Sequence, residues 1–301
     1  MLKVPWLRVL RELHRRQTLV AVAEALSYST SAVSQQLRQL EKDIGVALVE
    51  PVGRRLALTP QGRILAEHAE VILAQIKHAE ADVLASTGQP RGSVTVAGFQ
   101  SAALTLIPRM IIDLNERYPA VNVVFRQGEP RETIPALLSA DVDVVITESY
   151  PGVPIQQLPG ITITHLMSDP LWLTMASSVA DRLDGSQDLI GQLKTEGWAV
   201  ENANTPPRTW VTNQCRRAGF EPRIVCTSED LAVQANFVAS GHAVALLPGL
   251  ALTGQHRDLR QFSAGGRPEV RNVLAAHRDT GRSESAVDEV VRSLKLVAEG
   301  M

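Results

Sequence analysis

The chain has 301 residues, 45% of them apolar and 21% charged, which is enough for two or three domains with cores of their own. No run approaches the ~18 consecutive apolar residues of a membrane helix, and the N-terminus lacks the apolar segment and cleavage site of a signal peptide. Two cysteines make no disulfide framework, so we expect a cytoplasmic protein without membrane association.

The net charge of −2 conceals an asymmetry along the chain. Residues 1–63 carry ten lysines and arginines against five acidic residues, whereas the remainder carries twenty against twenty-seven. A basic segment joined to an acidic remainder is typical of a nucleic-acid-binding domain attached to a module with another role. A merely solvated charged surface is the alternative, and the separation of the two signs weighs against it.

Helical spacing of apolar residues predicts three helices before residue 45. The first carries Trp6, Leu7, Val9, Leu10 and Leu13; the second carries Leu19, Val22, Ala23 and Leu26; the third carries Val33, Leu37, Leu40 and Ile44. Thr18 stands where an N-cap is expected, and Gly45 stands where the third helix ends. Hydroxyl residues at 27–30 break the pattern between the second and third helices.

The polar face of the third helix carries short and amide side chains that can approach base edges in a major groove. A hairpin follows, with Gly53, Arg54 and Arg55 at its tip between strand-like residues 48–49 and 56–58. Paired arginines on a tight turn suit phosphate or minor-groove contacts. We therefore expect DNA contacts from Thr18, Thr30, Ser31, Ser34, Gln35, Arg38, Arg54 and Arg55.

The motif AEAL-x-YSTSAVSQQLRQLEKDIGV-x-L, followed by GRRLALTPQG, closely resembles the DNA-binding segment of LysR-type bacterial transcriptional regulators. Helix-turn-helix patterns arise by chance in short windows, but here the turn, recognition helix, arginine hairpin and next helix all follow in order. The resemblance covers about residues 4–87. It implies a sequence-specific transcriptional regulator with a winged helix-turn-helix at residues 1–60.

This segment also departs from the family pattern at three places. Thr30-Ser31 replaces a Gln-Pro-like pair, Gln35 stands where arginine is frequent, and Pro51 stands where an arginine often follows the acidic residue. Smaller hydroxyl groups and one phosphate-binding cation fewer predict an altered base preference or weaker non-specific binding.

A long helix is predicted from Thr59 and Pro60, with residues 61–87 as a linker. Its apolar residues recur at heptad spacing: Leu65, Ala69, Ile72, Ile76, Ala79 and Val83. We expect an intersubunit coiled coil rather than a helix packed only on its own domain. The resemblance implies the same: a homodimer through this helix that assembles into a tetramer and sets two DNA-binding heads at adjacent half-sites.

Strands and helices alternate beyond residue 92, which predicts a mostly parallel sheet covered on both faces. Strands are expected at 93–99, 121–128, 143–147, 170–177, 197–202, 223–228, 242–248 and 269–277. The fold class is therefore α/β, with two Rossmann-like lobes. The resemblance implies a periplasmic-binding-protein-like effector domain at 92–301, with lobe I at about 92–167 plus 267–301, lobe II at about 168–266, and crossings near Ser168 and Gly266.

Ligands of open α/β sheets bind at the carboxyl ends of strands and at helix N-termini. Ser101 and Thr147 match positions where the resemblance implies effector contacts. Topology adds Ala102, Asn202, Thr205 and Ser228. An ordinary N-cap role is an equal alternative for each serine and threonine. The family suggests a small organic acid or amino acid as effector, and Arg208 can pair with a carboxylate.

The sequence shows no catalytic serine, histidine and aspartate grouping, no phosphate loop and no metal-ligand spacing, so we expect neither an enzyme nor a cofactor. A solute-binding protein and an enzyme with a DNA-binding head are the other possible classes. A redox regulator that uses Cys215 and Cys226 is a further alternative, since Arg216 and Arg217 can lower the pKa of the Cys215 thiol. Cys226 is expected on a buried strand, where an inert thiol is the default.

Overall fold

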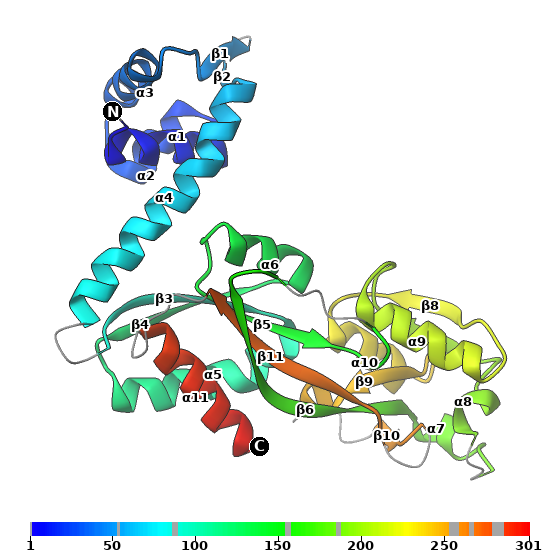
Figure 1. The fold of residues 1–301 in the computed structure, drawn as a ribbon. Helices are drawn as coiled ribbons and strands as arrows, with labels where there is room; N and C mark the ends of the chain where they lie inside the picture. The colour runs from blue at the N-terminus through cyan, green and yellow to red at the C-terminus, as the bar shows by residue number, and fades with distance from the viewer. Residues whose placement is uncertain are drawn as a thin grey trace. The chain divides into compact units, whose positions relative to one another are not determined.

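The computed structural model describes residues 2–52, 55–85, 90–153, 158–184, 188–252, 259–264, 268–278 and 286–301. The chain forms two compact units (Figure 1). The first contains Met1–Gln89 together with Pro135–Val142, and the second contains Pro90–Ile134 and Asp143–Met301.

Four helices and one hairpin make up the described residues 4–85. They are α1 (Val4–Arg16), α2 (Leu19–Leu26), α3 (Thr30–Ile44), β1 (Val49–Val52), β2 (Arg55–Leu58) and α4 (Pro60–Ala85). The two strands pair antiparallel, with Val52 opposite Arg55. The predicted helices and hairpin of this segment are confirmed.

Side-chain caps begin three of these helices. The hydroxyls of Thr18, Ser29 and Thr59 each accept the backbone amide three residues further along, at 3.3, 3.1 and 3.0 Å. Such a cap satisfies one of the amides that a helix leaves without an internal partner. Gly45 ends α3 with a φ of +81°, a conformation that glycine adopts without steric cost.

The core of this segment comes from the apolar faces that the spacing predicts. Its fully or almost fully buried members include Val9, Leu10, Leu13, Val22, Val33, Leu37, Leu40 and Leu48. Ile44 is an exception, because it lies in the last turn of α3 and remains 37% exposed.

Helix α4 uses its heptad positions in two ways. Ala69 is buried, and Leu65 and Ile72 pack with it against Leu7 of α1. Near the C-terminal end of the helix, Val83 is 68% exposed. The first half of the predicted seam is thus occupied within its own subunit, which leaves only the second half for a partner helix.

The second unit contains a seven-stranded sheet in the order β10-β6-β11-β5-β3-β4, with β9 also paired to β6, and a separate β7-β8 pair. The strands are β3 (Gly92–Gly98), β4 (Val121–Gln127), β5 (Val144–Ser149), β6 (Ile161–Ala176), β7 (Gly197–Val200), β8 (Arg223–Thr227), β9 (Ala245–Pro248), β10 (Leu259–Phe262) and β11 (Val270–Arg278). The helices are α5 (Gln100–Arg117), α6 (Pro130–Leu138), α7 (Ser177–Ala180), α8 (Leu189–Gln192), α9 (Pro206–Arg217), α10 (Leu231–Ala239), the 3-10 helix η1 (Gly249–Leu252) and α11 (Ala286–Glu299).

The prediction of a mostly parallel sheet is wrong. Strand β3 runs parallel to β4 and β5, and β7 runs parallel to β8. Strand β11, however, is antiparallel to both β5 and β6, and β9 and β10 are antiparallel to β6. In the described parts of the chain no crossover helix lies directly before β6 or β11, and parallel neighbours need such a connection.

Strand β6 is 16 residues long and begins at Ile161, well before the predicted start at residue 170. Its first half mixes polar and apolar residues because it is only partly buried, so apolar content alone does not reveal it. It pairs with β11 as far as Pro170 and with β9 from Leu171. This change of partner lies close to the predicted crossing at Ser168, whereas Gly266 lies outside the described residues.

Two groups of buried side chains flank this change of partner. In the first, α5 and α11 lie side by side and pack on the central strands (Figure 1), with Leu106, Met110, Val96, Val273 and Val290 in the interior. In the second, Trp198 and Trp210 lie among residues of β6, β7 and α9. The α/β fold therefore contains two lobes, each with its own core.

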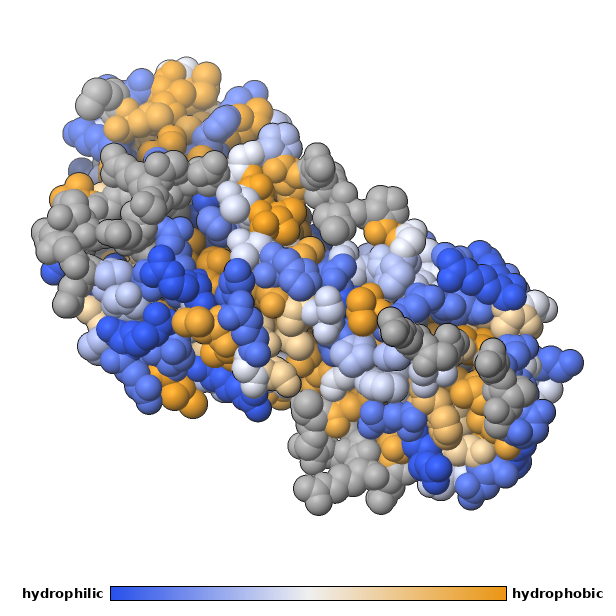
Figure 2. Space-filling model, turned by 60° about the horizontal axis from the view of Figure 1, so that its bottom comes forward, coloured by the Kyte–Doolittle hydropathy of each residue, from blue (hydrophilic) through white to orange (hydrophobic). Residues whose placement is uncertain are grey.

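Hydrophilic and hydrophobic residues are interspersed over the face of the molecule in Figure 2. Within the described ranges, no helix has both the length and the apolar character needed to span a bilayer.

Candidate functional site

Helix α3 presents a continuous polar face. Thr30, Ser31, Gln35 and Arg38 are exposed and Ser34 is half-buried, while the opposite face of the helix lies in the core. The Ser31 hydroxyl lies 2.9 Å from the hydroxyl of the N-cap residue Ser29, which orients it at the start of the helix. This face has the size and chemistry that base edges in a major groove accept.

Of the other predicted DNA-contacting residues, Thr18 is exposed at the start of α2, where its hydroxyl caps that helix. Arg55 begins β2. Arg54 lies outside the described residues.

A carboxylate that the sequence reasoning missed attaches the hairpin to α3. Glu41 accepts the backbone amides of Leu48 and Val49 at 2.8 and 3.1 Å. An acidic residue on the last turn of a helix before a hairpin is the only sequence signal for this role. The Glu41 side chain thus helps to fix the orientation of the hairpin relative to α3.

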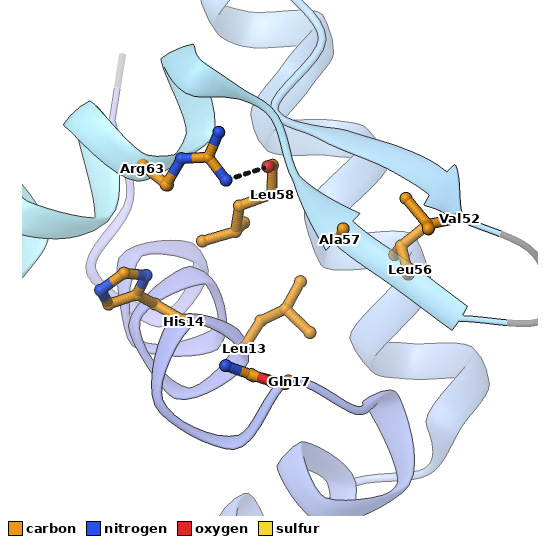
Figure 3. A pocket seen from close by; sticks show the side chains of 8 residues that line it. All are labelled: Leu13, His14, Gln17, Val52, Leu56, Ala57, Leu58 and Arg63. Atoms are coloured by element: carbon orange, nitrogen blue, oxygen red, sulfur yellow. Dashed lines mark hydrogen bonds between the residues drawn. The ribbon is translucent and has the colours of Figure 1, made fainter.

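A pocket of about 330 Å³ lies between α1, the hairpin and the start of α4 (Figure 3). Its walls are mainly apolar, and Arg63 at one side donates a hydrogen bond of 3.1 Å to the Leu58 carbonyl. The full lining is Leu13, His14, Gln17, Val52, Leu56, Ala57, Leu58 and Arg63. None of these described lining residues is among the predicted DNA-contacting residues.

Close packing at Gly62 holds α4 against the residue that precedes the hairpin. A Cβ atom at this position would lie 2.0 Å from the Leu48 carbonyl oxygen, a distance that no side chain tolerates. Thr59 adds a hydrogen bond of 2.9 Å from its hydroxyl to the Ala47 carbonyl.

In the second unit, contacts between the lobes link helix N-termini. The side-chain amide of Gln100 donates to Asp230 at 2.9 Å and accepts the backbone amide of Leu231 at 2.8 Å, which joins α5 to α10. Arg131 at the start of α6 makes a two-pronged contact with Glu229, with one bond of 2.8 Å. These contacts lie where strand ends of the two lobes meet, the usual location of ligand sites in open α/β sheets.

Arg271 lies beneath this region and is 2% exposed. Its guanidinium donates to Asp169 at 2.9 Å, to Glu148 at 2.5 Å and to Ser101 at 2.7 Å. Burial opposes its charge, but Glu148, Tyr150 and Asp169 outweigh burial and raise the pKa of Arg271. The arginine thus ties β11 to β5, β6 and α5.

A cavity of about 100 Å³ opens above this cluster. Three carboxylates from separate parts of the chain line it: Glu129 just before α6, Glu148 within β5 and Glu201 just after β7. The other lining residues are Pro130, Arg131, Asn204, Thr205, Pro206 and Pro207. Acidic groups therefore dominate the charge of this cavity.

The acidic groups raise one another's pKa. Burial is the largest cause for Glu201, and Glu148, Glu129 and Glu229 add to it, so that the pKa of Glu201 rises to about 8. Burial, Glu148 and Glu229 likewise raise the pKa of Glu129 to about 7. Both values reflect carboxylates that are poorly hydrated and face like charges.

The predicted effector residues occupy different environments. Ser101 and Ala102 are completely buried, and the Ser101 hydroxyl accepts from Arg271. Thr205 caps α9 and lines the cavity. Thr147 is half-buried on β5, beside the cavity residue Glu148.

The remaining two predicted residues belong to the surrounding network. The exposed Asn202 donates to Glu229 at 2.7 Å, and the Ser228 hydroxyl accepts the Asp230 amide at 3.0 Å. Arg208 donates to the backbone carbonyl of Glu201 at 3.0 Å, so its guanidinium braces the loop that follows β7.

Sequence reasoning missed Glu129, Glu148, Glu201 and Arg271. A signal was present for three of them, because Glu148 and Glu201 lie just beyond runs of apolar strand residues and Arg271 interrupts an apolar strand. Charged residues at such positions seldom lie in an interior unless they are paired or functional.

The alternative of a redox-active Cys215, activated by its neighbouring arginines, is not supported by the surroundings of this thiol. Cys215 is completely buried, and burial raises its pKa to about 12. Arg216 pairs with Glu221, and Arg217 lies 3.6 Å from Glu269, so neither arginine activates the thiol. Burial also raises the pKa of Cys226, which belongs to a different apolar cluster. Among the residues that the structure describes, no group of histidine, cysteine and acidic side chains is arranged to hold a metal ion.

Comparison with known proteins agrees with this arrangement. Residues 5–63 match the model of the bacterial regulatory helix-turn-helix protein, lysR family, and residues 87–298 match the LysR substrate binding domain. The transcriptional dual regulator GltC of Bacillus subtilis (strain 168) is 27% identical over 242 residues, which cover 80% of this chain and 79% of GltC.

Solved structures agree in fold. The crystal structure of CbnR, a LysR family transcriptional regulator, has a TM-score of 0.70 at 21% identity and covers 99% of both chains. Full-length CbnR complexed with its target DNA has a TM-score of 0.69 at 19% identity, covering 98% of this chain and 100% of that one. The chain belongs to the LysR family of bacterial transcriptional regulators, with a DNA-binding helix-turn-helix domain and a substrate-binding domain in one polypeptide.

Proposed function

We propose that residues 1–60 bind operator DNA, that residues 61–87 join two subunits, and that residues 92–301 bind a small-molecule effector. Within the last segment, lobe I is residues 92–167 with 267–301, and lobe II is residues 168–266. The exposed polar face of α3 carries the first part of this proposal, since a helix N-terminus with hydroxyl, amide and guanidinium groups is suited to a major groove.

The proposed DNA contacts divide by chemistry. Ser31, Ser34, Gln35 and Arg38 face base edges from α3. Thr18, Thr30, Arg54 and Arg55 contact phosphates or the minor groove. Phosphate contacts position a protein on DNA, whereas base contacts set its sequence preference. The similarity to the transcriptional dual regulator GltC, and to CbnR in a complex with its target DNA, supports this role.

The subunit contact is proposed for the C-terminal half of α4, where Val83 is exposed and Ile76 is only half-buried. Exposed apolar residues of α5, Leu104 and Ile112, are 68% and 61% exposed and suit a second interface. A dimer built through α4 and a tetramer built through a second surface follow from these two patches.

The effector site is proposed between the lobes, at the cavity lined by Glu129, Glu201 and Thr205. Binding there changes the contacts of Gln100 and Arg131, which link the lobes, and thereby shifts the balance between two arrangements of the oligomer on DNA. The protein acts in the cytoplasm as a regulator rather than as an enzyme. A free-standing solute-binding protein is less consistent with the DNA-binding head.

The test is a filter-binding and footprinting assay with the promoter regions nearest the protein's own gene. We expect a protected, sequence-specific site whose affinity falls steeply with salt, because Lys and Arg displace counterions from the phosphates. Equal affinity for every promoter fragment and for random DNA at modest salt would contradict the proposal. A footprint or bend that shifts on addition of a bound effector would support the proposed coupling.

A further inference from the structure

We propose that the effector of this protein is a cation, an amine or guanidinium compound whose positive group enters the cavity between Glu129, Glu148 and Glu201. This inference rests on the proposed role of the cavity as the effector site. It departs from the acid or amino acid that the sequence resemblance suggests.

The cavity presents acceptors that the protein itself does not use. Within the described residues, neither the Glu129 nor the Glu201 carboxylate has a hydrogen-bond or ion-pair partner, although both line the cavity. Glu148 is partly committed, because its Oε2 accepts from Arg271 and its carboxylate also interacts with the Tyr150 hydroxyl. Poorly hydrated carboxylates of this kind gain most from a bound cation that donates hydrogen bonds.

Charged groups around the cavity leave its balance negative. Glu229 and Glu132 add two carboxylates, and the hydroxyl of Tyr150 lies close to Glu148. The guanidiniums of Arg131 and Arg271 oppose them. Arg131 is held by both oxygens of Glu229, and Arg271 is divided among Glu148, Asp169 and Ser101, so both cations are already engaged.

Prolines at the helix N-termini around the cavity provide a second argument, because they remove backbone amides that an anion would use. Helix α6 begins with Pro130, and α9 begins with Pro206 and Pro207, none of which has an N–H. The next amide of α9, that of Arg208, is directed to the Thr205 hydroxyl at 3.4 Å. Anion sites at helix N-termini depend on free backbone amides, and these prolines remove three of them.

The third helix of this region shows the same pattern. The first amide of α10, that of Leu231, is bound by Gln100, and the next, that of Ala232, is bound by Asp230 at 2.9 Å. An effector carboxylate would therefore meet carboxylates and proline rings, whereas an ammonium or guanidinium group would meet three acceptors.

The size of the cavity limits what enters it. A volume of about 100 Å³ is small compared with the roughly 300–1,000 Å³ of sites for drug-sized ligands. It suits the charged head of a linear amine, with the remainder of the molecule lying between the lobes. Asn204 and Thr205 at the rim supply polar groups for that remainder.

Proton release gives this proposal a distinct signature. The pKa values of about 8 for Glu201 and about 7 for Glu129 mean that the empty cavity holds protons near neutral pH. A cation binds the ionised carboxylates and expels those protons. The affinity of the protein for a cation should therefore rise between pH 6 and pH 8, by up to about tenfold per pH unit for each proton released. Aliphatic amines have a pKa near roughly 10, so they keep their charge over this range.

The experiment uses isothermal titration calorimetry on the full-length protein with 1,4-diaminobutane and agmatine as cationic probes. Succinate serves as the anionic probe and 1,4-butanediol as the neutral one. We expect at least one cationic probe to bind at millimolar or lower concentration, and to bind more strongly at pH 8 than at pH 6. Protons should be released in proportion to the amount of probe bound. Glu201→Gln and Glu129→Gln should each weaken it about tenfold or more. Glu116→Gln, which removes an exposed carboxylate of α5, is the matched control and should leave it unchanged.

Three outcomes would overturn the proposal: no cationic probe binds up to 10 mM at either pH, succinate binds more tightly than the diamine, or Glu201→Gln binds the diamine as well as the unaltered protein does. Circular dichroism and operator binding of each variant show whether it is folded. If the protein footprints its operator but binds no cationic probe, only the proposed cationic nature of the effector is contradicted. If the protein binds a cationic probe but no operator, the proposed regulatory role of the cavity is contradicted instead.

Discussion

Arg271 and Glu148 form an ion pair of 2.5 Å between neighbouring strands β11 and β5, and both side chains are almost completely excluded from solvent. The pair lies directly under the cavity that Glu148 lines. Because β11 also pairs with β6 and Arg271 also holds Asp169 and Ser101, one guanidinium joins the strands and the helix at the floor of the proposed effector site.

Removal of the guanidinium should therefore destabilise the second unit strongly. Arg271→Met leaves Glu148 and Asp169 buried without their cation, and breaking a buried pair in this way costs about 3–5 kcal/mol. Urea unfolding followed by circular dichroism measures the loss. Arg260→Met on the exposed part of β10 is the control and should change the unfolding free energy by less than about 0.5 kcal/mol. Equal stability of the two variants would show that the buried cluster contributes no net stability.

The polar face of α3, which we propose binds DNA, should tolerate little change. Arg38→Ala removes an exposed cation and should reduce operator affinity by about 1–3 kcal/mol if it reads a base, with relaxed preference at that base pair. A uniform loss over all sequences, with a smaller salt slope, would assign Arg38 to a phosphate instead. Fluorescence anisotropy with operator and scrambled duplexes separates the two cases. Arg260→Ala, with the same loss of charge, should bind both duplexes as the unaltered protein does.

Stability should depend on pH through the cavity carboxylates. The pKa values of Glu201 and Glu129, about 8 and about 7, lie above those of the unfolded chain, so the folded protein binds more protons between about pH 4.5 and pH 8. Their contribution therefore favours the folded state at low pH and is lost as the pH rises through these values. Thermal unfolding without ligand should show a Tm difference between Glu201→Gln and the unaltered protein that favours the variant at pH 8.5 and shrinks towards pH 5.5. A difference that is constant with pH would contradict the raised pKa.

Close packing at Gly62 should make this glycine irreplaceable. Gly62→Ala places a methyl group 2.0 Å from the Leu48 carbonyl oxygen, so α4 or the hairpin must move, at a cost of about 1–3 kcal/mol. The variant should lose operator affinity more than it loses secondary structure, because the hairpin is displaced. Gly300→Ala, whose added Cβ would have no neighbour closer than 3.6 Å, is the control. Unchanged operator affinity of Gly62→Ala would mean that the hairpin position is not critical.

The two thiols should be inert in the native protein. Burial raises the pKa of Cys215 to about 12 and raises that of Cys226, so thiolate is scarce at pH 8. We expect slow reaction with a thiol reagent until the protein is unfolded, and no effect of dilute hydrogen peroxide on operator binding. Rapid labelling of the folded protein, or a loss of operator binding that Cys215→Ser abolishes, would instead support the redox alternative.

The sequence by itself determined the local elements and the class of protein. The helices of residues 4–85 were predictable because their caps and apolar spacing act between residues a few positions apart, as at Thr18, Ser29 and Thr59. The same locality made the polar face of α3 visible, since residues three or four positions apart share a helix face.

Only the tertiary structure decided the direction of β6 and β11 and the chemistry of the cavity. Strand pairing depends on residues that are distant along the chain. Apolar content alone therefore predicted only the second half of β6, and the sheet was wrongly expected to be mostly parallel. The cavity likewise combines Glu129, Glu148 and Glu201 from separate parts of the chain. Arg271, 170 residues further along the chain, donates a hydrogen bond to Ser101, which the sequence had suggested as a ligand contact. Electrostatic interaction depends on distance in space rather than along the chain, and folding alone sets that distance.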